Sequence, residues 1–161
     1  AIQNGGFIRQ DRWYPPGTVM TEEMIRAEMP FPKRPDLLSA SGAELKRGLE
    51  EMLAPTPAPV GCFPQLSEGF RLTYCPSAPA MAKIQRLELH GREVQLDERY
   101  LVAISEFYSA APGDGVEAFS KMEHVASHGR LIREVALEHM RSLGTVDGGL
   151  EGRIEVVPPC D

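Results

Sequence analysis

The sequence predicts a single α+β domain in which a mixed β-sheet packs against helices. Its helix-like and strand-like segments are interspersed without the strict alternation of a doubly wound fold. Fourteen prolines and fifteen glycines divide the chain into short elements. The 161 residues suit one domain, or two very small ones, and are enough to bury roughly two thirds of the unfolded surface. We therefore assign residues 1–161 to one domain.

The first forty residues contain a strand end, a short helix and a strand. Residues 1–10 have the pattern of a strand that enters a tight glycine loop. Thr21–Glu28 is predicted as a helix, because Thr21 can cap it and glutamates occupy its first turn. Prolines stop this helix, and Asp36–Ala40 follows as a candidate strand.

The segment Ser41–Leu53 carries the clearest helical pattern. Ser41 and Glu44 have the spacing of a capping box, in which each side chain bonds to the backbone N–H of the other residue. The apolar residues at helical spacing form one stripe, made of Leu45, Leu49, Met52 and Leu53. We expect this stripe to face the core.

Three strand signals follow. Residues 70–74 alternate apolar and polar side chains, which is typical of a half-buried strand. Residues 83–96 are predicted as a hairpin with His90 and Gly91 at its turn. The run "YLVAI" within residues 99–104 predicts a more fully buried strand.

A last helix and a last strand are predicted near the end of the chain. The helix spans Leu131–Leu143, and Gly144 is a natural stop for it. Its expected inward face consists of Leu131, Ile132, Val135, Met140 and Leu143. Gly152–Val157 is predicted as the closing strand.

Composition and charge exclude several classes of function. The net charge of −6 argues against a nucleic-acid binder, which would show a basic face. No apolar run approaches 18 residues, so no membrane span is predicted. The opening residues lack the basic start and apolar centre of a signal peptide, and the chain is expected to begin in mid-structure, as an excised domain would. The cellular compartment stays open.

The three cysteines are too few for a disulfide framework, and none has zinc-type spacing. Cys62 and Cys75 are the pair that we consider for a disulfide, and the sequence leaves their state open. His124 and His128 are four residues apart and could share one face of a helix, but no third ligand is evident, and we expect them to be surface residues. We predict no metal site in this chain.

A glycine loop near the start of the chain is the first candidate site. Two glycines allow close backbone approach, and they are flanked by Asn4 and Arg9. An amide and a planar guanidinium suit a ribose or a phosphate group. The alternative is a plain glycine turn with a surface arginine.

The segment "MPFPKRP" (residues 29–35) is the second candidate. Prolines on both sides of Phe31 stiffen the backbone, so the ring is presented at low entropic cost. Lys33 and Arg34 place positive charge beside it. The alternative is a core phenylalanine in a stiff connection.

The third candidate is the loop "SEFYSAAPGDGV" (residues 105–116). Phe107 and Tyr108 offer aromatic faces on which a nucleobase can stack, and Asp114 can accept hydrogen bonds from a base or a ribose. The alternative is a Gly-Asp-Gly turn with one buried aromatic side chain.

Taken in order, these segments resemble a known family. The chain carries six of its motifs, over nearly its whole length, as "NGGFIR", "MPFPKRP", "SGAELKRGLE", "GCFPQLSEGFRLTYCP", "SEFYSAAPGDGV" and "EGRIEV". They are similar to the C-terminal, substrate-binding domain of the 5′-nucleotidase and metallophosphoesterase family. That family includes 5′-nucleotidases, UDP-sugar hydrolases and 2′,3′-cyclic nucleotide phosphodiesterases.

The resemblance implies a role for each candidate residue. Phe31 and a second aromatic residue would sandwich the base of a nucleotide or nucleoside ligand. Phe107 is favoured as the second ring because the preceding strand sets its direction, whereas a count back from Asp114 selects Tyr108. Asp114 would contact the base or ribose.

Other positions follow the family less closely. Asn4 and Arg9 would lie near the sugar and phosphate, while Lys33 stands where some relatives have a base-contacting asparagine. Glu106 and Pro112 replace an asparagine and a glycine of the family pattern, which leaves base identity and stacking geometry open. Phe63 is expected to belong to the core.

The resemblance also implies that the chemistry is supplied by another domain. Two divalent metals, Zn, Mn or similar, are expected on a metallophosphatase domain N-terminal to residue 1, where they activate a water for attack on phosphorus. The motifs of that domain are absent from this sequence. The chain would bind the nucleotide of a phosphoric ester hydrolase in nucleotide catabolism and be inactive alone. The alternatives are a stand-alone, non-catalytic binding module and a substrate domain for sugar-phosphate or thiosulfate-type ligands.

Overall fold

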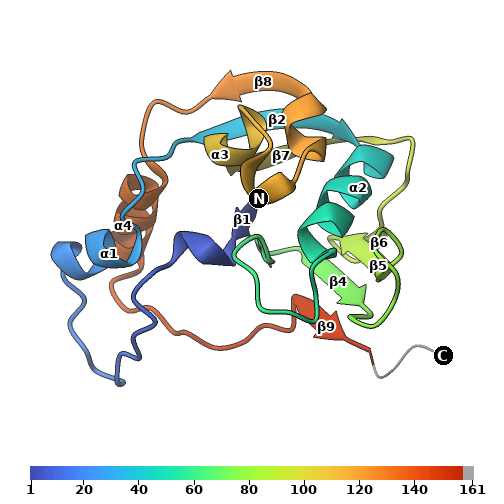
Figure 1. Cartoon of the computed structure of the whole chain (residues 1–161). Coiled ribbons are helices and arrows are strands. Elements are labelled where there is room, and N and C mark those ends of the chain that lie inside the picture. Colours follow the sequence, from blue (N-terminus) through green and yellow to red (C-terminus); the bar gives the residue numbers. More distant parts are fainter. Residues whose placement is uncertain (158–161) are drawn as a thin grey trace.

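Two mixed β-sheets form the framework of residues 1–157, the part of the chain that a computed structural model describes (Figure 1). In chain order the elements are β1 (Ile2–Asn4), η1 (Gly5–Phe7), α1 (Glu22–Glu28), β2 (Pro35–Ser41), α2 (Gly42–Leu53), β3 (Pro64–Leu66), β4 (Phe70–Tyr74), β5 (Ile84–Leu89), β6 (Arg92–Glu93), β7 (Arg99–Ser105), α3 (Glu106–Ser109), η2 (Gly113–Gly115), η3 (Ala118–Lys121), β8 (Glu123–Ser127), α4 (Ile132–Leu143) and β9 (Ile154–Val156), where η marks a 3₁₀-helix. The α+β class is confirmed, with the strands divided between two sheets.

The larger sheet has the strand order β3-β1-β7-β2-β8, and the smaller one has the order β6-β5-β4-β9. Each sheet contains one parallel pair, β1 with β7 and β4 with β9, among antiparallel neighbours. The strand β2 pairs with β7 over its whole length, from Pro35↔Ser105 to Ser41↔Arg99. Since β1 runs parallel to β7 and β2 runs against it, the end of β1, the end of β7 and the start of β2 lie at one edge.

The helix α2 joins the two sheets. It contacts β2 and β3 of the larger sheet and β5 of the smaller one. Its capping box forms as predicted, with Glu44 N donating to Ser41 Oγ at 3.2 Å and Ser41 N donating to Glu44 Oε2 at 2.7 Å. The predicted apolar stripe is buried. Gly48 allows a close approach, because a Cβ there would lie 2.5 Å from Cζ of Phe119.

The strand β7 is less buried than predicted. Val102 and Ile104 are buried on one face, but Leu101 points to the opposite face and is 68% exposed. Apolar side chains along the whole strand led to the expectation of burial on both faces. The reason for the difference is that the outer face of the larger sheet stays open at Leu101.

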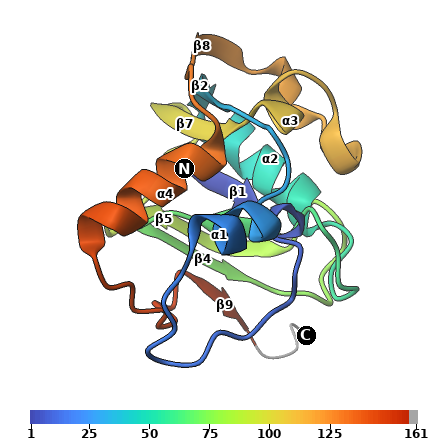
Figure 2. The same ribbon diagram turned by 90° about the vertical axis from the view of Figure 1, so that its left-hand side faces the viewer.

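The helix α4 forms where predicted, and its expected inward face is confirmed only in part. Leu137 is the buried side chain of this helix, while Val135 and Leu143 are exposed. The two views agree that α4 lies beside α1 at one side of the molecule (Figures 1 and 2). Leu131, Ile132 and Met140 of the predicted stripe are half-buried, and a neighbour as short as α1 leaves Val135 and Leu143 uncovered.

The fold answers two questions that the sequence left open. Cys62 is a buried free thiol that contacts the carbonyl oxygen of Met52 at 3.4 Å, so it does not pair with Cys75. Burial raises the pKa of the Cys62 thiol, with the charge of Asp114 adding to the effect. His124 lies in the strand β8, which the sequence did not indicate, so His124 and His128 do not share a helix.

None of the helices within residues 1–157 combines the length and the apolar character needed to span a bilayer.

Candidate functional site

The sheet edge at which β1 and β7 end and β2 begins brings the three candidate segments together. Asn4 ends β1, Glu106 follows β7, and Arg34 precedes β2. The backbone N–H of Glu106 donates to the carbonyl oxygen of Arg34 at 2.9 Å, and the N–H of Arg34 donates to Glu106 Oε1 at 3.1 Å. Glu106 therefore ties the segment that carries Phe31 to the helix that carries Phe107.

A pocket of about 430 Å³ opens at this edge. Its lining residues are Asn4, Gly6, Phe7, Arg9, Phe31, Lys33, Gly61, Phe107 and Asp114. The structure thus places every predicted site residue on the pocket wall except Tyr108. This placement establishes proximity, and the binding roles of these residues remain predictions.

Phe31 forms one aromatic wall of the pocket. Its half-buried ring meets the ring of Phe7 at 5.9 Å between centroids and 51° between planes. The guanidinium carbon of Arg9 lies 4.9 Å from the Phe31 ring centroid, a cation–π contact. The backbone turns tightly after this ring, because Lys33 N donates to the carbonyl oxygen of Phe31 at 2.9 Å. Phe31 is therefore a wall of the pocket and not a core residue.

Phe107 forms a second aromatic wall, and Tyr108 supports it from inside. The two rings lie 4.9 Å apart, nearly perpendicular at 77°, and Tyr108 is fully buried. Ser105 caps α3 by accepting a hydrogen bond from Phe107 N at 3.3 Å. Because the chain enters a helical turn here, successive side chains diverge, one toward the pocket and one into the core.

Gly113 makes room for the Phe107 ring. A Cβ at this position would lie 2.4 Å from Cε1 of Phe107, so only a glycine lets the loop backbone lie against that ring. The next residue, Asp114, has φ 51° and ψ 23°, in the left-handed region that aspartate tolerates better than most residues. Within the Gly-Asp-Gly motif, Gly113 therefore makes room for the Phe107 ring, and Asp114 provides a carboxylate.

Asp114 is held by the buried tyrosine. Tyr108 OH donates a hydrogen bond to Asp114 Oδ2 at 3.1 Å. Burial raises the pKa of Tyr108, and the charge of Asp114 raises it further, so the hydroxyl stays a donor at all ordinary pH values. Asp114 itself is exposed, and its second carboxylate oxygen has no hydrogen-bond donor among residues 1–157. That oxygen is available to a ligand.

Asn4 is largely used by the protein itself. It is buried, its Nδ2 donates to the carbonyl oxygen of Gly61 at 3.2 Å, and its Oδ1 accepts from Gln3 Nε2 at 2.7 Å. Gly6 lies just as close, since a Cβ there would be 2.8 Å from Cα of Gly61. The glycine loop therefore positions the floor of the pocket.

Arg9 and Lys33 supply unpaired positive charge. Within the described part of the chain neither side chain forms a hydrogen bond or an ion pair, and Arg9 has only its contact with Phe31. Two cations and one carboxylate, that of Asp114, therefore line the pocket. This balance suits an anionic ligand that also presents hydroxyl or N–H donors.

Sequence reasoning missed Phe7 and Gly61 on the pocket wall. Phe7 is buried beside the glycine loop and supports Phe31 by ring contact. Its position directly after Gly6 was a usable signal. Gly61 meets Gly6 from a distant part of the sequence, and no local pattern indicates such a contact. Phe63, which was expected in the core, is partly buried and packs against the hydrophobic core and the ring of Tyr74.

The side chains of residues 1–157 include no group of three or more His, Cys, Asp and Glu residues arranged to hold a metal ion. His124 lies 3.6 Å from Asp36 and contacts Ser127 at 3.0 Å, away from the pocket. The two metals that the resemblance implies therefore have no candidate ligands in this part of the chain.

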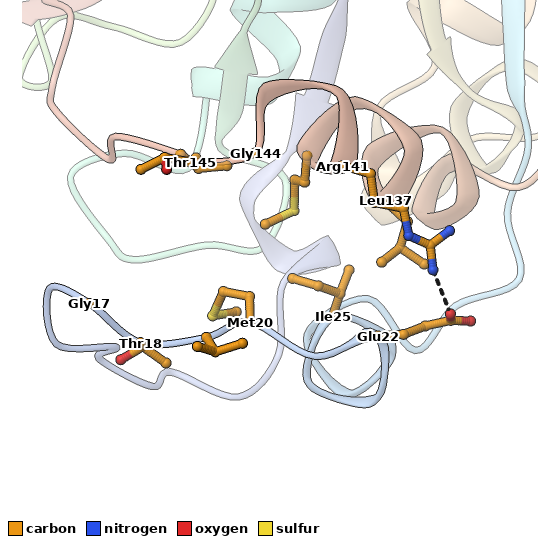
Figure 3. A pocket seen from close by; sticks show the side chains of 12 residues that line it. Gly17, Thr18, Met20, Glu22, Ile25, Leu137, Arg141, Gly144 and Thr145 are labelled. Atoms are coloured by element: carbon orange, nitrogen blue, oxygen red, sulfur yellow. Dashed lines mark hydrogen bonds and ion pairs between the residues drawn. The ribbon is translucent and has the colours of Figure 1, made fainter.

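A second pocket, of about 470 Å³, lies between the loop at residues 17–20, α1 and the end of α4 (Figure 3). It contains none of the predicted site residues. An ion pair between Arg141 and Glu22 crosses it at 2.9 Å. Without aromatic side chains or an unpaired carboxylate and cation, this pocket is a weaker candidate than the first.

Comparisons with known proteins agree with the sequence motifs. The family model described as the C-terminal domain of 5′-nucleotidase matches residues 1–121. The trifunctional nucleotide phosphoesterase YfkN of Bacillus subtilis is 29% identical over 163 residues, which cover 98% of this chain and 11% of that protein.

Solved structures share the fold. The 5′-nucleotidase precursor of Thermus thermophilus has a TM-score of 0.88 and 27% identity, over 97% of this chain and 31% of that one. The sulfate thiohydrolase SoxB of Thermus thermophilus has a TM-score of 0.64 and 24% identity, over 88% of this chain and 26% of that one. The second likeness concerns the fold alone. In each case the chain spans less than a third of the relative's length.

Proposed function

This chain belongs to the family of 5′-nucleotidase C-terminal domains, and on that premise we propose that it is the nucleotide-binding domain of a phosphoric ester hydrolase. The proposal assigns it the grip on the nucleoside and the orientation of the phosphate. A metallophosphatase domain, N-terminal to this one in the parent protein, would carry the two divalent metals and the hydrolytic step. The chain covers only 11% and 31% of the lengths of two relatives, and this supports the division of roles between domains.

The observation that carries the proposal is the shared pocket of Phe31 and Phe107. Neither ring is buried in the core, and each is backed by a second aromatic side chain, Phe7 or Tyr108. A base stacked on such rings gains about 1–3 kcal/mol per base. Both walls are set before the ligand arrives, so little binding energy is lost in ordering them.

The polar groups of the pocket complete the assignment. The free oxygen of Asp114 would accept a hydrogen bond from a ribose hydroxyl or a base N–H. Arg9 and Lys33 would attract the anionic part of the ligand. A nucleotide held at these points presents its phosphate in one orientation. Such positioning lowers the entropic cost of bringing the phosphate to the groups that react with it.

Titration of the chain with adenosine, uridine and ribose 5-phosphate, followed by NMR, tests the proposal. We expect saturable shifts at Phe31 and Phe107 with both nucleosides. Ribose 5-phosphate, which has no base, should bind more weakly. If ribose 5-phosphate or thiosulfate bound while both nucleosides did not, the non-nucleotide alternative would replace this proposal. The unpaired cations Arg9 and Lys33 are the observation that favours that alternative.

A second measurement separates a hydrolase domain from a stand-alone binding module. The chain alone, with added Mn²⁺ or Zn²⁺, is expected not to hydrolyse AMP. Hydrolysis by this chain would contradict the assignment of the metals to another domain. A metallophosphatase domain encoded directly upstream would support the hydrolase, and its absence would favour the binding module.

A further inference from the structure

The segment Pro30–Pro35, here called the rim segment, carries both Phe31 and Lys33 into the pocket. It connects α1 to β2 and contains no regular secondary structure before Pro35. Its prolines restrict the backbone, and its position relative to the sheet depends on hydrogen bonds with other segments. Glu106 supplies one set, at Arg34.

The other set comes from residues 128–133, which lie far from the rim segment in the sequence. Arg133 Nη1 donates to the carbonyl oxygen of Pro30 at 3.1 Å. Ile132 N donates to the carbonyl oxygen of Lys33 at 2.9 Å, and His128 N donates to that of Pro35 at 2.9 Å. The two residues that flank the Phe31 turn are thus both bonded to the start of α4.

The start of α4 is itself held in place. Glu134 Oε2 accepts from Leu131 N at 2.9 Å, which caps the helix. Leu137 is buried, and Arg141 forms the ion pair with Glu22 of α1 (Figure 3). These contacts give the helix a fixed position from which Arg133 can reach Pro30.

Arg133 has an unusual feature for a residue at a helix surface. Its Nε is shielded from solvent and has no hydrogen-bond acceptor within the described residues. A shielded donor without a partner opposes folding, so its presence calls for a physical reason. The reason offered by the geometry is that the packing which shields Nε also directs Nη1 at the carbonyl oxygen of Pro30.

We propose that Arg133 is a positioning residue that fixes the Phe31 wall of the pocket. The inference rests on the proposed function, since it assumes that Phe31 stacks on a base. Arg133 lies outside residues 1–121, the part that the family model matches. It acts through the backbone of Pro30, and its contribution is preorganisation of the ring before the ligand binds.

Amide hydrogen exchange in the ligand-free chain tests the positioning itself. The substitution Arg133→Met keeps an unbranched apolar side chain out to the position of Nε and removes the donors. We expect the amides of Lys33 and Ile132 to exchange about tenfold faster in this variant, since local opening requires fewer bonds to break. The matched control is Arg86→Met, which removes an exposed arginine of β5 and its ion pair with Glu88, outside α4 and the rim segment. Unchanged exchange in Arg133→Met would overturn the proposal.

A double-mutant cycle tests whether Arg133 acts through Phe31. Arg133→Met should raise the Kd for adenosine about fivefold, and Arg133→Lys, which can still donate to Pro30, should restore most of the affinity. In a Phe31→Leu background the same substitution should have an effect of less than about twofold. An equal effect in both backgrounds would show that Arg133 stabilises the fold without positioning the ring, and would overturn the proposal.

The two measurements separate this inference from the proposed function. If the unmodified chain bound neither adenosine nor uridine, the nucleoside-binding function would fail, and with it the role of Arg133 in ligand binding. The exchange experiment would still decide whether Arg133 holds the rim segment. If nucleosides bound and Arg133→Met changed neither exchange nor affinity, only the further inference would fail.

Discussion

Tyr108 OH donates a hydrogen bond to Asp114 Oδ2 at 3.1 Å, although Tyr108 is fully buried and Asp114 is exposed. The hydrogen bond joins the core of the domain to Asp114 on the wall of the candidate pocket. It leaves one carboxylate oxygen free and fixes its direction. Of the two neighbouring aromatic residues, Tyr108 therefore orients the acid, while Phe107 supplies the half-buried ring on the pocket wall.

The first prediction concerns this bond. Tyr108→Phe keeps the ring and removes the donor, so we expect a loss of about 1 kcal/mol in the free energy of unfolding. The freed carboxylate loses its orientation, and adenosine binding should weaken about threefold or more. Urea unfolding and calorimetric titration measure the two effects. Unchanged affinity in a variant that has lost stability would argue against a role of Asp114 in binding.

The second prediction concerns the aromatic walls. Phe31→Ala and Phe107→Ala should each weaken adenosine binding by about tenfold or more, because each removes one stacking face. The matched control is Phe63→Leu, a change at a half-buried ring outside this pocket. In the complete parent enzyme the same substitutions should raise KM for a nucleotide. A KM that stays the same in both variants would contradict the stacking role.

The third prediction uses the closeness of Gly113 to Phe107. Gly113→Ala places a Cβ 2.4 Å from the ring, so the ring or the loop must move. We expect a loss of about 1–3 kcal/mol in stability, as for other overpacked sites, and a loss of adenosine affinity. Gly129→Ala is the control, because nothing lies within 4 Å of a Cβ added there. If both variants behaved alike, the loop would have more freedom than the structure indicates.

Local patterns were sufficient to predict most elements of the fold. The capping box of Ser41 and Glu44 and the alternation in residues 70–74 report directly on the backbone, because each depends on neighbours close in sequence. The strand β8 could not be found in this way. All five of its side chains are exposed, so it lacks the alternation that identifies a half-buried strand.

Site residues could be predicted where their immediate sequence neighbours indicate the local backbone conformation. Phe31 could be found because the flanking prolines restrict its backbone, and Asp114 because glycines flank it. The choice between Phe107 and Tyr108 required the turn of α3, which begins directly after β7 and separates the two rings. The contacts of Gly61 and Arg133 with the pocket segments join distant parts of the chain, and such contacts leave no trace in local spacing.

The fourth prediction concerns acid and the anchoring of α3. Asp36 at the start of β2 accepts a hydrogen bond from Ser109, the last residue of α3. Burial alone would raise the pKa of Asp36, but hydrogen bonds from Ser109, Ser127 and His124 together outweigh it, so the net pKa is lowered from the ordinary value of 3.8. The ionised carboxylate is therefore more stable in the folded chain than in the unfolded one.

The sign of the pH dependence follows from this direction. A carboxyl group with a lowered folded-state pKa contributes its full stabilisation above the unfolded value near 3.8 and loses it as the pH falls through the lower folded value. The chain should thus be more stable than its Asp36→Asn variant at pH 7, and the difference should shrink below about pH 4. Because other carboxyl groups titrate in both proteins, the difference in urea midpoints isolates Asp36. Since α3 carries Phe107, nucleoside affinity should fall in the variant at pH 7 as well. A stability difference that stayed constant down to about pH 2 would mean that Asp36 anchors α3 without its charge.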